Sequence, residues 1–287
     1  MKTIIFFILT MLICIKLISV TGKSYEGTKD IFIQATDSNV TLQLLTQSKK
    51  IISERLRIYG LEPSDIEILA DKGQLKIQCP QHIKVSEING LLTYKGELAF
   101  YETYNRKEIA DLLKNNNQLF DLLKNTPETN PSDSKIGCLA PENCDRVNEY
   151  LLLNRPDINC KFVWGMKSHK SLICLYALKT KTEGQPLLIR SDVETIKSSQ
   201  DKKSQSFMIE MKFNQAATRI WANATRDNLN RSIAIVLDNS VFYDPVVKTA
   251  MENGLCEITG NLTIKDVNYF LALVNNDQLP LSFNLLR

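Results

Sequence analysis

The chain has 287 residues, of which 44% are hydrophobic and 23% are charged, a composition typical of a globular protein with about two domains. The 35 basic and 32 acidic residues leave a net charge of +3. This balance excludes a strongly basic nucleic-acid-binding protein and an acidic disordered tail. With only two histidines, His82 and His169, the sequence also excludes a histidine-rich metal site.

The first residues predict an export signal. A short basic start precedes an apolar run over 4–15, and Lys16 interrupts that run before it reaches the roughly 20 residues that a spanning helix needs. We therefore predict a signal peptide over 1–22 and a protein in the periplasm or cell envelope. An uncleaved anchor is the main alternative. A lipoprotein attached at Cys14 is disfavoured by the bulky Ile13.

Hydrophobic spacing over 28–104 predicts the element order β-α-β-β-α-β. The predicted elements are a strand at 31–34, a helix over 40–59 that ends at Gly60, strands at 66–69 and 74–79 joined by a turn at 71–73, a helix over 85–92, and a strand at 97–104. In the long helix, Leu45, Ile52 and Leu56 recur at helical spacing on one face. The order is typical of a ferredoxin-like fold, with both helices on one face of a sheet.

The rest of the chain predicts a second α+β region. The predicted elements are helices over 109–123, 147–153, 215–229 and 263–274, strands at 161–164, 172–179, 207–213 and 232–237, a loop over 125–141, and an exposed turn over 198–206. Thr263 and Asp266 are spaced as a capping box at the start of the last helix.

Six cysteines follow the predicted signal: Cys79, Cys138, Cys144, Cys160, Cys174 and Cys256. An even set in an exported chain permits disulfides, and six cysteines allow 15 pairings. Cys138 and Cys144 flank a short loop that contains proline, so we predict that these two form a disulfide. The paired spacing that is typical of zinc sites does not occur, and we predict no metal.

The sequence contains none of the common nucleotide-binding, hydrolase or metalloprotease motifs. Asp238 follows a predicted buried strand, where a catalytic aspartate could lie, but a turn role beside Asn239 and Ser240 is favoured. We therefore predict a protein that is not an enzyme, with no catalytic residue and no cofactor.

An ordered set of motifs runs through the last third of the chain. A strand ends at Asn214, the next helix contains Thr225 and Asn228 as Thr-x-x-Asn, the run IAIVLD covers 233–238, and ITGNLT covers 258–263. Leu-Pro at 279–280 follows near the end. Earlier in the chain lie ERLRIYGLEP at 54–63, LKIQCP at 75–80 and ELAFYETY at 97–104.

This succession resembles the first periplasmic domain of SecD, and of the fused SecDF proteins of Bacteroidetes, an accessory subunit of bacterial protein export. The resemblance implies a ferredoxin-like base, 28–104 plus 263–287, split by an inserted α+β head, 105–262. The residues that match the family pattern have scaffold roles: Arg55, Gly60, Pro63, Asn214, Thr225, Asn228, Asp238, Gly260 and Pro280.

The resemblance implies a non-enzymatic periplasmic protein that assists export by binding translocating or unfolded polypeptide and by docking on Sec translocon subunits. The balanced charge predicts no nucleic-acid partner. The family's later transmembrane helices, which carry its proton pathway, do not follow, so we expect a truncated relative without a proton channel of its own. The family's SAP is Tyr243-Asp244-Pro245 here. A secreted module that reuses the fold for another envelope partner or ligand is the alternative, and a hydrolase is a third hypothesis.

Overall fold

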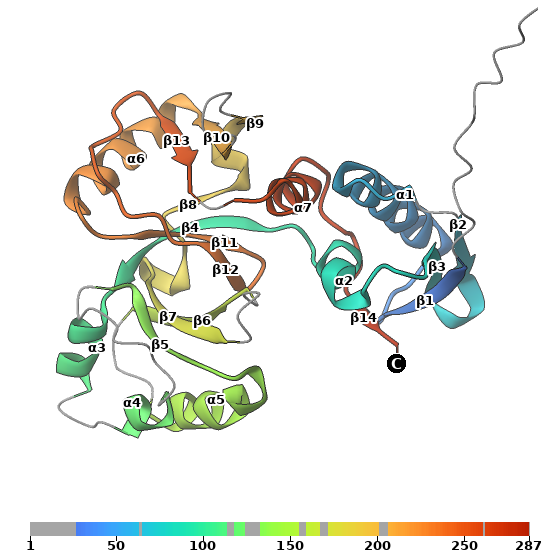
Figure 1. The fold of residues 1–287 in the computed structure, drawn as a ribbon, viewed down its shortest axis with the longest axis horizontal. Coiled ribbons are helices and arrows are strands. Elements are labelled where there is room, and N and C mark those ends of the chain that lie inside the picture. Colours follow the sequence, from blue (N-terminus) through green and yellow to red (C-terminus); the bar gives the residue numbers. More distant parts are fainter. Residues whose placement is uncertain are drawn as a thin grey trace, which may run out of the picture.

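The computed structural model describes residues 27–62, 65–113, 118–123, 133–154, 159–166, 172–200, 206–260 and 262–286. The predicted signal peptide, 1–22, and Pro63 lie outside these residues. Within the described ranges no helix is both long and apolar enough to cross a membrane. Figure 1 shows two bodies side by side, with helix α7 (Ile264–Val274) between them.

The first body is a four-stranded antiparallel sheet with helices. Its elements are β1 (Thr28–Ala35), α1 (Leu42–Tyr59), β2 (Asp65–Leu69), β3 (Gln74–Pro80), α2 (Val85–Thr93) and β14 (Phe283–Leu285), and the strand order is β14-β1-β3-β2. Thr41 caps the start of α1, and Gly60 ends this helix with φ 96°, a left-handed conformation that favours glycine. The predicted hairpin of β2 and β3 and the two helices are confirmed.

One predicted strand lies in a different sheet. β4 (Leu98–Tyr104) pairs with β11 (Ile233–Leu237), so the prediction that 97–104 completes the first sheet is wrong. β14 pairs with β1 in its place, from the end of the chain. Hydrophobic spacing identified β4 as a strand, but both of its faces are largely buried and its partner lies more than a hundred residues away. No local pattern could therefore assign it to a sheet.

The second body contains a seven-stranded sheet. Its strands are β4, β5 (Lys135–Leu139), β6 (Cys160–Gly165), β7 (Ile173–Lys179), β8 (Leu188–Ile189), β11 and β12 (Ser240–Tyr243). The pairings β4–β7, β7–β6, β6–β12, β12–β11 and β11–β4 close on themselves, and we call this closed set the strand ring. One buried cluster joins inward-facing side chains from these strands: Tyr101, Val163, Tyr176, Leu178, Ala234, Val236 and Val241.

Helices cover the outside of the strand ring. A second cluster joins it to α3 (Arg106–Leu112), α4 (Gln118–Leu122) and α5 (Cys144–Leu153). The predicted helix over 109–123 is therefore two described helices. β5 lies within the predicted loop 125–141, so that prediction is wrong over Lys135–Leu139. The loop is predicted there because the segment includes glycine and polar side chains next to a run rich in proline and serine. Short 3-10 helices lie at Ala70–Lys72, Pro141–Asn143, Thr182–Gly184 and Arg190–Asp192.

A three-stranded sheet completes the second body. It consists of β9 (Val193–Gln200), β10 (Phe207–Phe213) and β13 (Leu255–Ile258) in the order β13-β10-β9, with α6 (Gln215–Asp227) packed beside it. Asn214 caps α6, and Thr263 and Asp266 form the predicted capping box of α7. The predicted turn begins at residue 198, but β9 continues as a strand through Gln200, so the prediction is wrong over 198–200. Residues 201–205 of that prediction lie outside the described residues.

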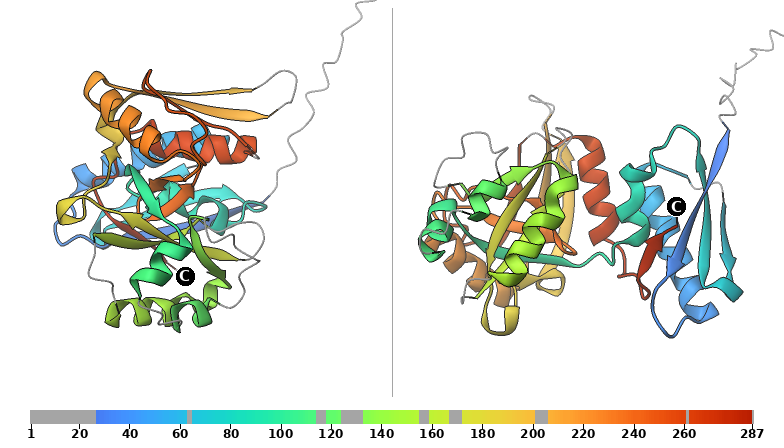
Figure 2. Two further views of the ribbon diagram at one scale, coloured as in Figure 1. Left: turned by 90° about the vertical axis from the view of Figure 1, so that its left-hand side faces the viewer. Right: turned by 90° about the horizontal axis from the view of Figure 1, so that it is seen from below.

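Helix α7 joins the two bodies into one core. It packs on α1 and α2 of the first body and on β9 and β10 of the second, and the views of Figure 2 agree with this arrangement. A single buried cluster runs from Ile33 of β1 through Phe270 of α7 to Phe213 of β10. The two bodies are therefore connected by apolar packing as well as by the chain.

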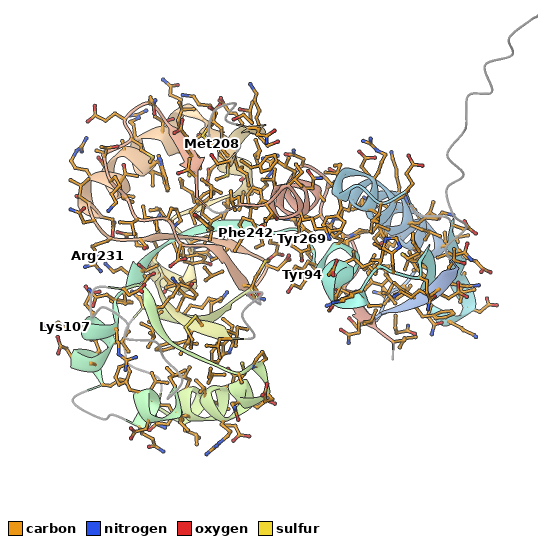
Figure 3. The ribbon with its side chains drawn as sticks, in the orientation of Figure 1. Tyr94, Lys107, Met208, Arg231, Phe242 and Tyr269 are labelled. Carbon is orange, nitrogen blue, oxygen red and sulfur yellow. A yellow bond between two sulfur atoms is a disulfide. The ribbon has the colours of Figure 1, made fainter. Side chains whose placement is uncertain are left out.

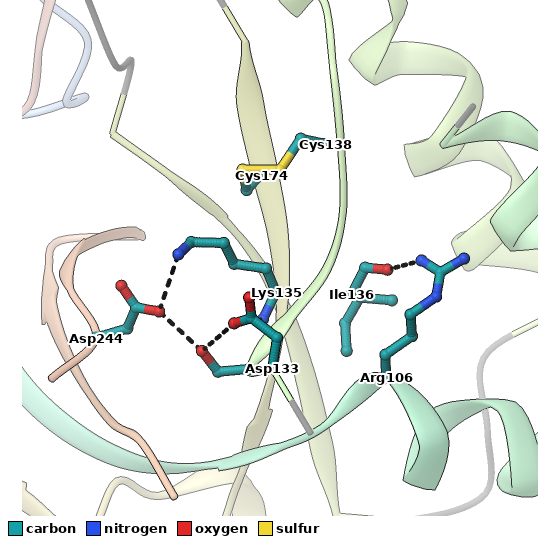
Figure 4. The surroundings of a disulfide bond; sticks show 8 residues. Arg106, Asp133, Lys135, Ile136, Cys138, Cys174 and Asp244 are labelled. Atoms are coloured by element: carbon teal, nitrogen blue, oxygen red, sulfur yellow. Dashed lines mark hydrogen bonds and ion pairs between the residues drawn. A yellow bond between two sulfur atoms is a disulfide. The ribbon is translucent and has the colours of Figure 1, made fainter. Parts of the chain in front are cut away.

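The structure contains one disulfide within the described residues, Cys138–Cys174, drawn in Figure 4. The prediction that Cys138 pairs with Cys144 is wrong. β5 pairs with β7 in a register that sets Cys138 directly opposite Cys174, whereas Cys144 is the first residue of α5. The pairing was not predictable because β5 itself was not predicted as a strand.

Candidate functional site

The two bodies meet around the connecting segment Tyr94–Glu97, between α2 and β4, and we call this segment and the groups that hold it the junction. Arg55 of α1 is fully buried beneath it. Its Nη1 donates to the carbonyls of Tyr94 (2.5 Å) and Leu91 (3.4 Å), and its Nη2 donates to the carbonyl of Lys95 (2.8 Å). One side chain thus donates to three backbone acceptors around the end of α2, where helix carbonyls lack partners within the helix.

Asp238 holds the junction from the second body. It follows β11, and its backbone is left-handed with φ 53°, which aspartate tolerates better than most residues. Its carboxylate accepts from the backbone N–H of Gly96 (3.2 Å to each oxygen) and of Glu97 (3.4 Å). Its own N–H donates to the Glu97 carbonyl at 2.7 Å. The predicted turn role of Asp238 therefore includes a long-range contact, 142 residues along the chain from Gly96.

Other segments converge on the same place. The N–H of Leu279 donates to the Lys95 carbonyl at 3.0 Å, so the Leu-Pro motif at 279–280 also lies at the junction. Arg190 donates to the Val274 carbonyl at the end of α7, and the rings of Phe242 and Phe270 lie 4.8 Å apart. Figure 3 shows Phe242 between the two bodies together with Tyr94 and Tyr269.

At the junction, burial and the neighbouring charges shift the pKa values of Arg55 and Asp238 in opposite directions. Burial lowers the pKa of Arg55 to about 10, while the negative charge of Asp238 and the Tyr269 hydroxyl act to raise it. Burial raises the pKa of Asp238, and the two backbone N–H donors and Arg55 act to lower it. Arg55 therefore remains charged at neutral pH. The arrangement fixes a connecting segment between two opposite charges, and it contains no nucleophile paired with a base.

Gly96 shows how closely the junction is packed. A Cβ on this residue would lie 2.7 Å from Nη2 of Arg55 and 2.7 Å from the backbone oxygen of Leu273, and its φ is 92°. Gly60 has nearly the same φ, 96°, but a Cβ there would meet nothing within 4 Å. The two glycines thus form a matched pair with nearly the same φ and different surroundings.

We expect Gly96→Ala to lower the free energy of unfolding by about 3 kcal/mol and Gly60→Ala by about 1 kcal/mol. Left-handed strain accounts for the loss at Gly60, and the clash with backbone and guanidinium adds the remainder at Gly96. Urea unfolding followed by far-UV circular dichroism measures both. Equal losses of unfolding free energy in the two variants would show that the junction rearranges to accommodate the added methyl group.

The remaining scaffold residues serve the second body and α1 locally. Asn228 donates to the Glu102 carboxylate of β4 and to the Ala224 carbonyl, and Thr225 accepts from the N–H of Met251 (2.9 Å). Asn214 and Gly60 cap helices, and a Cβ on Gly260 would lie 2.4 Å from the Tyr243 hydroxyl. Pro280 is half-buried after Leu279, and Pro63 lies outside the described residues. The structure thus brings together Arg55, Asp238 and the 279–280 motif, but not the others.

A second polar cluster lies beside the strand ring and the disulfide (Figure 4). Asp244, which follows β12, accepts from the Ser134 hydroxyl at 2.8 Å, lies 3.7 Å from the Lys135 ammonium, and hydrogen bonds to the Tyr176 hydroxyl. Its side chain is 19% exposed. These contacts tie the start of β5 to the strand ring. Sequence reasoning noted Asp244 only as a departure from the family pattern, because its partners lie far away in the chain.

The shifted pKa of the Asp244 carboxyl group predicts that the stability of the protein depends on pH. Burial raises its pKa above the ordinary value of an aspartate, although Lys135 and Ser134 act to lower it. The folded state therefore binds this proton more tightly than the unfolded state, so the contribution of Asp244 to stability falls as the pH rises above about 4. We expect Asp244→Asn to gain stability relative to the natural protein between pH 4 and pH 7, as measured by urea midpoints. A difference between the two proteins that stays constant with pH would contradict this.

Metal binding finds no support in the described part of the chain, where no group of three or more histidine, cysteine, aspartate or glutamate side chains could hold an ion. Cys79 and Cys256 are buried, and burial raises the pKa of both thiols, Cys256 to about 12. A thiol with a raised pKa is a poor nucleophile and a poor metal ligand at neutral pH. These cysteines therefore serve as small apolar core residues.

Part of the chain matches a known family. Residues 175–281 match the family model described as the SecDF P1 head subdomain. The matched segment begins within β7 and ends after α7, so it includes the three-stranded sheet, β11, β12 and Asp238 of the junction.

Curated proteins with similar sequences are protein translocase subunits SecD. The subunit of Acidaminococcus fermentans is 29% identical over 172 residues, which cover 56% of this chain and 41% of that protein. The subunit of Rickettsia conorii is 33% identical over 86 residues, 30% of this chain and 16% of that protein. That of Rhodothermus marinus is 27% identical over 155 residues, 50% of this chain and 24% of that protein. The chain thus spans less than half the length of these relatives.

Solved structures of SecDF are also similar to the chain. The crystal structure of SecDF in its super-membrane-facing form covers 91% of this chain and 30% of that chain, with a TM-score of 0.48 and 17% identity. A structure of SecDF, a membrane component that enhances protein export, covers 90% of this chain and 98% of that chain, with a TM-score of 0.46 and 18% identity. The sequence matches confirm the resemblance to the periplasmic region of SecD and SecDF, over 175–281 for the head subdomain.

Proposed function

We propose that the protein is a non-enzymatic envelope component that assists protein export, by binding translocating or unfolded polypeptide and by docking on Sec translocon subunits. The observation that carries this proposal is the match of 175–281 to the SecDF P1 head subdomain. The curated SecD relatives support a role in protein export. The proposal includes no nucleic-acid partner.

We infer a base with a ferredoxin-like fold and an inserted head. The antiparallel order β14-β1-β3-β2 supports the base, because it is the strand order of a β-α-β-β-α-β unit whose last strand arrives after a long insertion. The insertion would begin before β4 rather than after it, since β4 belongs to the strand ring. Helix α7 then lies between base and head and contacts both.

Two observations support a location in the cell envelope. The first 22 residues have the charge and apolar pattern of an export signal. The disulfide Cys138–Cys174 belongs to a class of bond that persists in oxidising compartments and is rare in the cytosol. Both support a protein that folds after export.

The junction suits a protein that transmits a load between two bodies. Arg55 from the base and Asp238 from the head hold the same connecting segment, and the apolar core continues through α7. A force applied to the head would thus be transmitted to the base through hydrogen bonds and apolar packing rather than through a flexible linker.

Crosslinking in the envelope of the native host tests this function. The tagged full chain would be crosslinked in living cells, purified under denaturing conditions, and its partners identified by mass spectrometry. We expect Sec channel subunits together with several different exported chains. A variant that lacks 1–22 and stays in the cytosol is the matched control. Recovery of one unrelated partner, or of none, would instead favour the secreted module that reuses the fold.

A further inference from the structure

Strand β9 has an open edge along most of its length. It is the outermost strand of the order β13-β10-β9, and it pairs only with β10, from Val193 to Gln200. Over 194–199 the structure shows no hydrogen bond or ion pair besides this pairing. All of these residues are exposed except Ile196, which is half-buried. The hairpin of β9 and β10 lies along the upper rim of the molecule in the left-hand view of Figure 2.

The other described edges are short or occupied. At the edge formed by β5, the guanidinium of Arg106 donates to the outward carbonyl of Ile136 (Figure 4). The edge strands β8, β13 and β14 have two, four and three residues, and β2 has five. β9 has eight residues and contains no proline. Proteins normally protect long edges with proline, charge or covering elements. β9 carries two exposed charges, Glu194 and Lys197, but no proline, and no described residue is hydrogen-bonded to its outer edge over 194–199, so its backbone remains open to strand addition.

The chemistry of the edge identifies the occupant as an extended polypeptide. An open edge offers alternating backbone N–H and C=O groups, and only another strand satisfies both. The side chains of Thr195, Ser198 and Ser199 are small and exposed, so they form no pocket that selects a particular sequence. Because α7 contacts β9, every second side chain of an added strand would face the α7 side of the sheet.

A second copy of this chain is disfavoured in the register that uses the whole of 194–200. A symmetric antiparallel pairing of β9 with its copy over 194–200 would set Lys197 directly opposite the Lys197 of the copy. Like charges directly opposite each other in a strand pair are destabilising. A copy whose pairing is centred on Ile196 or Ser198 avoids this repulsion but pairs with fewer residues of 194–200, whereas a foreign extended chain can pair with the whole edge in any register.

We propose that β9 binds an extended segment of a translocating polypeptide as an added strand, through backbone hydrogen bonds and with little dependence on its sequence. This proposal rests on the proposed function and specifies which surface of the head performs the binding. The eight residues of β9 would accommodate a segment of similar length.

A photocrosslinking experiment with paired peptides tests the edge directly. A benzophenone amino acid replaces Ser199 in the full chain, and the same amino acid replaces Glu67 of the shorter edge strand β2 as the matched control. The probe is an unstructured peptide of threonine, valine and serine. Its partner peptide has the same sequence but carries N-methyl groups on four consecutive central residues, which removes the backbone donors and leaves the side chains.

We expect the position of Ser199 to label the unmethylated peptide at least tenfold more than the methylated one, and the position of Glu67 to label neither above background. Equal labelling of both peptides at Ser199 would overturn the proposal, since side chains alone would then account for binding. Crosslinked dimers of the chain at Ser199 would overturn it in favour of a second copy. If exported chains are recovered from cells while Ser199 labels no peptide, the edge is refuted and the export function stands.

Discussion

Replacing Arg55 by methionine is expected to lower the free energy of unfolding by about 4 kcal/mol. The substitution preserves much of the side-chain volume but removes the donors to the carbonyls of Leu91, Tyr94 and Lys95. These carbonyls lie where water cannot readily replace the guanidinium, because Arg55 is completely buried. The loss also leaves Asp238 without its opposite charge.

Arg57 supplies the control on the same helix. Its side chain is 64% exposed and pairs with Glu54 of the preceding turn, so Arg57→Met should leave the urea midpoint unchanged. Arg55→Lys distinguishes charge from geometry. A lysine keeps the charge but cannot reach three carbonyls from one planar group, and we expect about half of the loss for this variant. If Arg55→Met were as stable as Arg57→Met, the junction would not depend on the guanidinium.

Removal of the Cys138–Cys174 disulfide is expected to cost about 4 kcal/mol. The bond closes a loop with a sequence separation of 36, and chain entropy in the unfolded state predicts a loss of this size when such a loop is opened. The double variant Cys138→Ala with Cys174→Ala removes the crosslink without leaving a buried thiol. Tryptophan fluorescence follows the unfolding of the second body, because Trp164 lies on β6 next to the disulfide-bonded strand β7 and the other tryptophan, Trp221, lies on α6.

The reductant dithiothreitol is the control for this experiment. It should destabilise the natural protein as much as the double substitution does, and it should not affect the double variant. Peptide mapping without reduction should recover Cys138 linked to Cys174. Recovery of Cys138 linked to Cys144 would restore the pairing expected from the sequence and would contradict the register of β5 and β7.

Local signals in the sequence were sufficient for most helices and many strands. Thr263 and Asp266 indicated the start of α7 because a capping box requires only residues three positions apart. Gly60 indicated the end of α1 for the same reason. β5 was missed because it is short and Gly137 and Cys138 separate its two large apolar residues, Ile136 and Leu139. β9 was missed because most of its side chains are exposed and polar, so they carry no hydrophobic period. Pairing with a neighbouring strand holds both in place.

The candidate site was only partly predictable. The family pattern selected Arg55 and Asp238 individually, yet nothing in the sequence indicated that both hold the segment around Gly96. Asp244 and Ser134 are 110 residues apart, and neither stands in a recognisable motif. Contacts of this kind depend on which strands become neighbours.

The sequence by itself determined the type of most elements, the helix ends and the resemblance to SecD, because each of these depends on residues close together in the chain or on an ordered set of motifs. Only the tertiary structure decided that β4 joins the strand ring, that β14 completes the first sheet, and that Cys138 meets Cys174. The physical reason is that backbone hydrogen bonds between strands are alike at every position. Sheet membership is therefore set by packing over the whole chain.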